Sequence, residues 1–287
     1  MTASIELDTL LEGIAFGEGP RWRDGALVFS DIAKHRVMRV DESGNLDCLF
    51  DLGERRPSGL GWLPDGRLLA VSMEDHLLMR QDGDQLEPWV DLSKWCGGHA
   101  NDMVVDASGR AYVGNIGFSL EAEVMEVAPT HIVCVDPDGS ARSVAGGVMC
   151  PNGMVITPDG ETLIAGESAA ARLAAYPILS DGSLGEHRIY AALPGGAAPD
   201  GICLDAEGAV WVSSPTTHEF LRVREGGEVA EHIPSGRRTA IACMLGGADR
   251  RTLFAITCGT SNISKAAQLG DGAISTTRVD VPGAGLP

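Results

Sequence analysis

Residues 152–166 read Asn-Gly-Met-Val-Ile-Thr-Pro-Asp-Gly-Glu-Thr-Leu-Ile-Ala-Gly. A polar residue and a glycine come first, then an apolar run, a Pro-Asp-Gly turn and a second apolar run. Two apolar runs separated by an Asp-Gly turn are typical of a β-hairpin, because Asp and Gly accept the positive φ that a tight turn needs. This stretch therefore predicts two antiparallel strands that begin at Asn152.

The same pattern occurs six times along the chain, and the sixth copy lacks the polar start. Successive copies begin 40, 43, 51, 48 and 42 residues apart, at Glu18, Ser58, Asn101, Asn152, Asp200 and Ala242. This period matches one four-stranded propeller blade, and the apolar runs 131–135 and 220–223 supply outer strands. The sequence predicts an all-β fold, a single six-bladed β-propeller domain over residues 1–287. A β-sandwich is the competing all-β fold, but it does not predict six repeats of similar length.

The sequence carries 40 Asp and Glu residues against 22 Lys and Arg, a formal net charge of −18. Such a field repels phosphate backbones and anionic membrane surfaces, so we expect neither nucleic acid nor a membrane as a partner. No run approaches the ~20 apolar residues of a membrane helix, and residues 1–10 lack a secretory signature. The seven cysteines are dispersed without a CxxC pair, as in a reduced protein. These features predict a cytoplasmic location.

The starts of the six units occupy one repeat position. The innermost strand of each blade runs along the central channel, so residues at one repeat position reach the same height around the axis. Glu18, Asn101, Asn152 and Asp200 then bring two carboxylates and two carboxamides together. Such oxygen donors suit a hard divalent cation, although Asn and Asp at strand starts also cap turns. The register of the four groups favours a metal site at one mouth of the channel.

Several stretches, in their order and spacing, resemble the family of senescence marker protein 30, gluconolactonase and luciferin-regenerating enzyme along nearly the whole chain. They are Glu18-Gly-Pro-Arg-Trp, Phe29-Ser-Asp-Ile, residues 101–110, Pro151-Asn-Gly-Met, Pro199-Asp-Gly-Ile and residues 246–254. The resemblance implies a propeller whose metal is held by Glu18, Asn152 and Asp200, with Asn101 contacting it directly or through water. It also implies lactone hydrolysis with one divalent ion: Ca²⁺ first, with Mn²⁺, Mg²⁺ or Zn²⁺ as alternatives.

Two positions depart from the sugar-lactonase members of that family. His99 stands where they have an Arg, and Ser119 lies near the place of an acidic residue that helps some of them bind sugar hydroxyls. The surrounding segment is apolar, with Ile116, Phe118, Leu120, Val124 and Met125, and Met149 precedes the Asn152 motif. An apolar rim suits a less hydroxylated lactone or ester. The alternative is that these side chains only pack a loop over the channel.

The resemblance makes Asp200 the candidate general base, and Asn101 and His99 complete the predicted catalytic set. His99 would orient substrate or relay a proton, or else it is a structural residue of the loop at Gly97 and Gly98. No Gly-x-Ser-x-Gly elbow, phosphate-binding loop or dinucleotide fingerprint offers other chemistry. The predicted function is a metal-dependent hydrolase that opens a small-molecule lactone or related ester. Phosphotriester hydrolysis at the same ion and a non-catalytic calcium-binding scaffold are the alternatives, and the oligomeric state is not set by the sequence.

The two ends of the chain are expected to meet, because a propeller must close its ring and the family pattern pairs both ends within one blade. The segment 4–10 is predicted to join the strands near residues 274–281.

Overall fold

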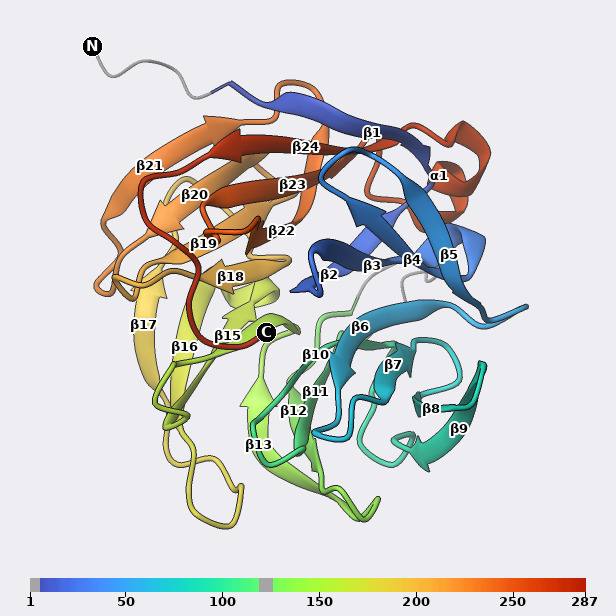
Figure 1. Cartoon of the computed structure of the whole chain (residues 1–287). Helices are drawn as coiled ribbons and strands as arrows, with labels where there is room; N and C mark the ends of the chain where they lie inside the picture. The colour runs from blue at the N-terminus through green and yellow to red at the C-terminus, as the bar shows by residue number, and fades with distance from the viewer. Residues whose placement is uncertain (1–5, 119–125) are drawn as a thin grey trace.

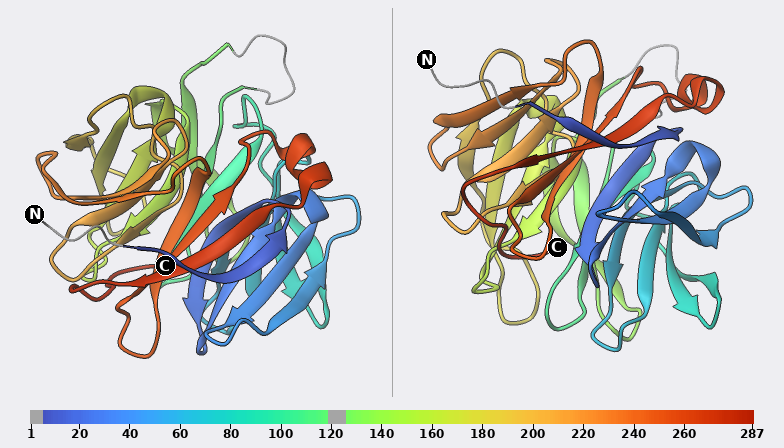
Figure 2. Two further views of the ribbon diagram at one scale, coloured as in Figure 1. Left: turned by 90° about the horizontal axis from the view of Figure 1, so that it is seen from above. Right: turned by 45° about the horizontal axis from the view of Figure 1, so that its top comes forward.

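The structure is a computed structural model that describes residues 6–118 and 126–287. These residues form six four-stranded antiparallel sheets arranged around a central axis (Figure 1; Figure 2). The predicted six-bladed β-propeller is therefore confirmed. Within the described ranges, no helix is long and apolar enough to cross a membrane.

Each blade is a meander whose first strand lines the channel. Blades 1 to 3 consist of β2 (Gly17–Arg23), β3 (Ala26–Asp31), β4 (Arg36–Asp41) and β5 (Leu46–Asp51); β6 (Pro57–Trp62), β7 (Leu68–Ser72), β8 (Leu77–Asp82) and β9 (Gln85–Asp91); and β10 (Ala100–Val105), β11 (Ala111–Asn115), β12 (Thr130–Val135) and β13 (Ala141–Val148).

Blades 4 and 5 follow the same plan, and blade 6 takes its outermost strand from the N-terminus. They consist of β14 (Pro151–Ile156), β15 (Thr162–Glu167), β16 (Arg172–Pro177) and β17 (Arg188–Ala192); β18 (Ile202–Leu204), β19 (Val210–Ser214), β20 (Glu219–Val223) and β21 (Val229–Pro234); and β22 (Thr239–Gly246), β23 (Thr252–Cys258), β24 (Gly272–Arg278) and β1 (Asp8–Ile14). The runs predicted as outer strands, 131–135 and 220–223, are β12 and β20, the third strands of their blades.

The predicted repeat starts lie at the channel ends of the innermost strands. Four of them, Glu18, Ser58, Asn101 and Asn152, are the second residues of β2, β6, β10 and β14, and Asp200 lies two residues before β18. The glycine after Asn152 has a packing reason. A Cβ atom on Gly153 would lie 2.6 Å from the main-chain oxygen of Asp200 in the next blade. The polar-Gly pair of the repeat thus lets neighbouring innermost strands approach closely.

The sixth blade joins the two ends of the chain. Strand β1 pairs with β24 in antiparallel register, with Asp8 opposite Thr276 and Ile14 opposite Gly272. The predicted pairing of the N-terminal segment with the C-terminal strands is confirmed, although β1 extends further along the chain than the predicted segment. Residues 4 and 5 of that segment lie outside the described residues.

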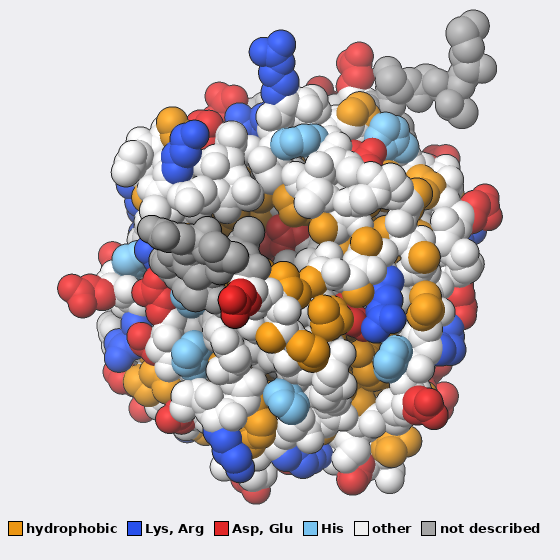
Figure 3. All heavy atoms as spheres, turned by 180° about the vertical axis from the view of Figure 1, so that it is seen from behind, with side chains coloured by type: hydrophobic (Ala, Val, Ile, Leu, Met, Phe, Trp, Pro, Cys, Tyr) orange, Lys and Arg blue, Asp and Glu red, His pale blue; other side chains and the backbone are white. Residues whose placement is uncertain are grey.

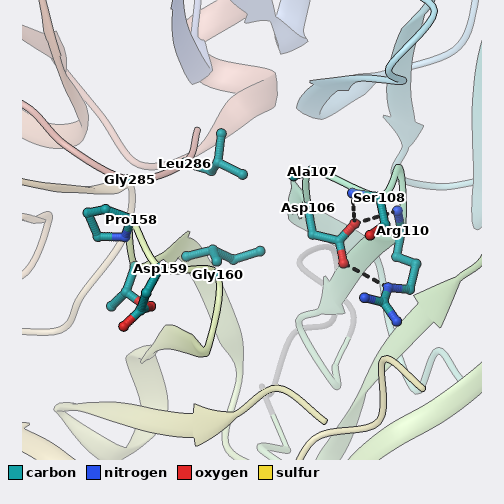
Figure 4. Close-up of a pocket in the computed structure, with 11 residues that line it drawn as sticks. Asp106, Ala107, Ser108, Arg110, Pro158, Asp159, Gly160, Gly285 and Leu286 are labelled. Atoms are coloured by element: carbon teal, nitrogen blue, oxygen red, sulfur yellow. Dashed lines mark hydrogen bonds and ion pairs between the residues drawn. The ribbon is translucent and has the colours of Figure 1, made fainter. Parts of the chain in front are cut away.

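The C-terminal residues 282–287 cross the mouth of the channel that faces the viewer in Figure 1. They bond to three blades in turn: the amide of Gly283 donates to the Arg250 carbonyl at 2.8 Å, that of Ala284 to Leu204 at 2.9 Å and that of Leu286 to Ile156 at 2.9 Å. Beside this tail lies a cavity of about 540 Å³ (Figure 4). Of its three charged residues, Asp106 and Arg110 pair with each other at 2.7 Å and the third is Asp159. None of the predicted site residues lines this cavity.

One short helix, α1 (Ile263–Leu269), lies between β23 and β24 and was not predicted. The Asn262 side chain accepts a hydrogen bond of 2.8 Å from the Lys265 amide, and Gly270 ends the helix with φ at 58°. An Asn before the first turn and a Gly after the last are the usual capping signals. They are present in the sequence, but a helix of seven residues, about two turns, has too little apolar periodicity to detect.

Candidate metal and substrate site

The predicted site residues meet at the mouth of the channel opposite the C-terminal tail. Glu18, Asn101, Asn152 and Asp200 line one cavity of about 170 Å³. Seen from behind, the molecule shows a hollow with acidic side chains at its base and hydrophobic side chains on its rim (Figure 3). Glu18 and Asn101 are buried, whereas Asn152 and Asp200 are partly exposed. Four groups separated by up to 182 residues in the sequence thus share one pocket.

The two carboxyl groups at the base interact directly. A side-chain hydrogen bond joins Glu18 to Asp200, and burial, followed by the charge of Asp200, holds the pKa of Glu18 well above its usual range. Burial raises the pKa of Asp200 to about 7, although hydrogen bonds from Glu18 and Asn152 oppose that rise. Two acids this close cannot both carry a full charge unless a cation separates them. Without a cation, the pair therefore retains a proton near neutral pH.

Hydroxyl groups orient the two amides. Asn152 Nδ2 donates to Ser168 Oγ at 3.3 Å, and Ser168 Oγ donates to the Pro199 carbonyl at 2.6 Å, so that one hydroxyl joins the segments of Asn152 and Asp200. On the other side, Ser58 Oγ donates to Asn101 Oδ1 at 3.4 Å. The sequence did not indicate this contact of Ser168 with a predicted site residue, because Ser168 follows β15 and belongs to no repeat start.

Buried acids hold the loops that lead into the site. In blade 1 the Asp31 carboxylate accepts hydrogen bonds from the amides of Ala15 (3.3 Å) and Phe16 (3.0 Å), two residues ahead of Glu18. In blade 4 the Glu167 carboxylate likewise accepts from the Met149 amide at 3.0 Å. Each acid ends the second strand of its blade and is followed five residues later by an Arg that pairs with it, Arg36 or Arg172. That shared spacing is a sequence signal that could have identified them.

A buried ion pair lies in the channel next to these polar residues. The guanidinium of Arg21 donates to Asp102 Oδ1 at 2.7 Å and to the Leu60 carbonyl at 2.9 Å, and both charged side chains are buried. The charge of Asp102 contributes to the raised pKa values of Glu18 and Asp200. Arg21 balances the charge of Asp102 at close range. Asp102 therefore already has a cationic partner, whereas Glu18 and Asp200 pair with each other.

His99 is less directly involved than predicted. It is half-buried and is not among the residues that line the cavity. Its carbonyl accepts a hydrogen bond of 2.8 Å from the amide of Ile116, which does line the cavity. Its main chain therefore supports the pocket wall, and its contact with substrate stays a prediction.

Most of the wall is apolar. Nine of the fourteen lining residues in the described part of the chain are hydrophobic, among them Phe16, Ile32, Met73, Ile116, Pro215 and Ile263. The predicted rim residues Ile116 and Phe118 are confirmed as part of this wall, whereas Met149 does not line it and its neighbour Cys150 does. Ser119, Leu120, Val124 and Met125 lie outside the described residues.

The donor set of this pocket fits a hard divalent cation. No group of three or more His, Cys, Asp or Glu side chains suited to a metal occurs in residues 6–118 and 126–287, so the amide oxygens must complete any ligand set. Because Asn152 Nδ2 is taken up by Ser168, its Oδ1 remains for a cation. Two carboxylates with two amide oxygens are the ligand chemistry of Ca²⁺ rather than of softer metals.

Comparison with known proteins agrees with the fold and identifies the family. The family model described as the SMP-30/Gluconolactonase/LRE-like region matches residues 16–259. The chain belongs to this family. The matched region begins before Glu18 and ends after the last innermost strand, so it includes Glu18, Asn101, Asn152 and Asp200.

Two relatives in this SMP-30/gluconolactonase/LRE-like family are sugar lactonases. A 6-deoxy-6-sulfogluconolactonase of Pseudomonas putida is 28% identical over 281 residues, which cover 94% of each chain. A pentonolactonase of Haloferax volcanii is 28% identical over 309 residues, covering 100% of this chain and 97% of its own. A solved gluconolactonase of Xanthomonas campestris has a TM-score of 0.75 at 26% identity, with 97% of this chain and 89% of that chain covered.

More distant members share the fold alone. A solved calcium-binding protein, regucalcin of Agrobacterium tumefaciens, has a TM-score of 0.81 at 20% identity and covers 99% of this chain and 97% of its own. The blade arrangement is thus shared at 20% sequence identity.

Proposed function

We propose that this protein is a divalent-metal-dependent hydrolase that opens lactone rings in the cavity at Glu18 and Asp200. The observation that carries the proposal is the convergence of two carboxyl groups and two carboxamides at the base of a pocket. The sugar lactonases among its relatives support the same reaction class. A single cavity of about 170 Å³, smaller than the roughly 300–1,000 Å³ of drug-sized sites, suits a small cyclic ester.

Glu18, Asn152 and Asp200 are the proposed metal ligands, and Asn101 contacts the ion directly or through water. Ca²⁺ is the proposed ion, with Mn²⁺, Mg²⁺ and Zn²⁺ as alternatives. When bound, a divalent ion polarises a carbonyl oxygen and makes a nearby water more acidic. The pair of acids that retains a proton without a cation would lose it on binding, so metal uptake releases a proton.

Asp200 is the proposed general base. It lies at the base of the pocket and is partly exposed to the cavity. Burial raises its pKa to about 7, which would let its carboxylate accept a proton from water near neutral pH. The charge of a bound cation would lower that basicity. Asn101, whose Oδ1 accepts from Ser58, retains its Nδ2 to donate to a substrate oxygen.

The test is hydrolysis of a lactone panel by chelated protein, with Ca²⁺, Mn²⁺, Mg²⁺ and Zn²⁺ restored singly. We expect turnover to vanish with chelator and to return with one ion. Asp200→Asn should abolish turnover, and a metal-induced rise in melting temperature recorded beside it shows whether the ion still binds. Retained turnover in Asp200→Asn with metal bound would remove Asp200 as the base. Melting that responds to metal with every lactone left closed would indicate a scaffold or phosphotriester chemistry instead.

A further inference from the structure

We infer that the substrate of this site is a lactone with apolar substituents rather than a polyhydroxylated sugar lactone. The inference rests on the proposed lactonase function and concerns its substrate class. It sets this chain apart from the relatives whose names denote sugar lactones. The residues that support it line the part of the pocket that the reacting ester group would not occupy.

A fixed ring of apolar side chains surrounds the polar base. Ile32, Met73, Ile116 and Pro215 each line the cavity, and each directly follows the last residue of the second strand of its blade. We call these four residues the apolar collar. The sheet register holds the collar next to the polar residues at the base of the pocket. The last residues of the second strands pair with the residues just before those polar residues, as Asp31 does with Gly17 and Asn115 with Ala100.

Two blades break the collar pattern. Blade 6 carries Gly259 at the equivalent position, and blade 4 carries Ser168, whose hydroxyl already donates to Pro199 and accepts from Asn152. Neither residue lines the cavity. Within the described residues, the polar lining groups are the four proposed site residues and Ser261, which is exposed at the rim. No Arg, Lys or His of the described chain lines the cavity.

A sugar lactone carries hydroxyl groups on its ring carbons, and each needs a hydrogen-bond partner once it leaves water. The collar offers none. A hydrophobic site rejects one added hydroxyl by roughly a hundredfold, whereas alkyl substituents would pack against Ile32, Met73 and Ile116, which are 1%, 3% and 6% exposed in the absence of substrate. The same wall that penalises a sugar therefore favours a hydrocarbon substituent.

The experiment compares two δ-lactones on the metal-restored protein: glucono-δ-lactone and a δ-lactone with a short alkyl chain. We expect kcat/KM to be at least about 100-fold higher for the alkyl lactone. Equal or better turnover of the sugar lactone overturns the inference but leaves the lactonase function standing. No turnover of either, with any of the four ions, overturns both.

A binding measurement separates specificity from chemistry. The corresponding alkyl δ-lactam and gluconolactam, which keep the ring but resist hydrolysis, are titrated calorimetrically into the metal-restored protein. The alkyl lactam should bind at least about 10-fold more tightly. Tighter binding of the gluconolactam would overturn the inference even if the alkyl lactone were turned over.

Variants test whether the side chains of the pocket wall cause the preference for the alkyl lactone. Met73→Gln keeps the side-chain length and adds an amide. Ile263→Gln also adds an amide, at a partly exposed lining position where a longer side chain is tolerated if Met73→Gln fails to fold. Either variant should lower the alkyl-to-sugar ratio of kcat/KM by at least about 10-fold, with the metal-induced melting shift unchanged. Leu179→Gln, at an outer surface position that is 48% exposed, is the matched control and should leave the ratio unchanged. A ratio unmoved in both pocket variants contradicts the inference.

Discussion

The guanidinium of Arg21 lies 2.7 Å from Asp102 Oδ1, and the two side chains are each 4% exposed. Arg21 comes from blade 1 and Asp102 from blade 3, so the pair spans the channel past blade 2. Its attraction is offset by the cost of removing two charges from water, so its clearest effect is seen when one partner is removed.

Arg21→Met should lower the free energy of unfolding by about 3–5 kcal/mol, because it leaves the Asp102 carboxylate buried and unpaired. Urea denaturation of the chelated protein measures the change. Arg188→Met is the matched control, since Arg188 pairs with Glu225 where both side chains are more than half exposed, and such pairs contribute about 0–1 kcal/mol. Similar losses for the two variants would contradict the role given to burial.

Ser168→Ala should weaken metal binding by about 10- to 100-fold, the usual cost of removing a group that orients a ligand. The variant removes the hydroxyl that joins Asn152 to the Pro199 carbonyl. Calorimetric titration with Ca²⁺ measures the affinity, and Ser180→Ala at an exposed position serves as the control. Unchanged affinity in Ser168→Ala would mean that Asn152 is held by the sheet alone.

The stability of the chelated protein should fall as the pH rises from about 4 to about 7. The folded pKa of Asp200 is about 7, above the unfolded value of about 3.9, and the pKa of Glu18 is also raised. An acid whose pKa is raised by folding binds its proton more tightly in the folded state, so deprotonation across this range favours unfolding. Melting temperatures of the wild type and of Asp200→Asn, recorded with chelator from pH 4 to 8, test this; the slope should be smaller in the variant.

Removing residues 1–14 should destabilise the whole ring, because it deletes β1 and exposes the edge of β24 in blade 6. Removing residues 282–287 deletes only the tail and its bonds to Arg250, Leu204 and Ile156, so it should lower the melting temperature less. The shorter deletion should also leave Ca²⁺ affinity unchanged, because the tail lies at the opposite mouth. If the first truncated chain melted like the full one, the ring would not depend on closure by β1.

The parts of the structure that repeat were predictable from the sequence. Each blade leaves its own copy of a hairpin pattern, so the fold, the innermost strands and the alignment of Glu18, Asn101, Asn152 and Asp200 follow from six aligned segments. Asp31 and Glu167 could have been found by their shared five-residue spacing to Arg36 and Arg172. Ser168 instead bonds to the Pro199 carbonyl 31 residues away, and Arg21 meets Asp102 past the intervening blade. No local pattern encodes such long-range pairs. The path of the C-terminal tail could not be predicted either, because its apolar and small residues show no regular repeat.

The closure of blade 6 by β1 also determines when the metal pocket comes into existence. Glu18 lies in β2 of blade 1, four residues after the end of β1, and Asp200 lies just before β18 of blade 5, on the other side of blade 6. The two carboxyl groups are therefore expected to meet only after the ring closes. During synthesis the ribosome releases the N-terminal end first, yet the strand that it carries has no partner until β24 emerges more than 250 residues later. The earliest segment to be made is thus among the last to dock, so the pocket that holds Glu18 and Asp200 is complete only after the last blade has been synthesised.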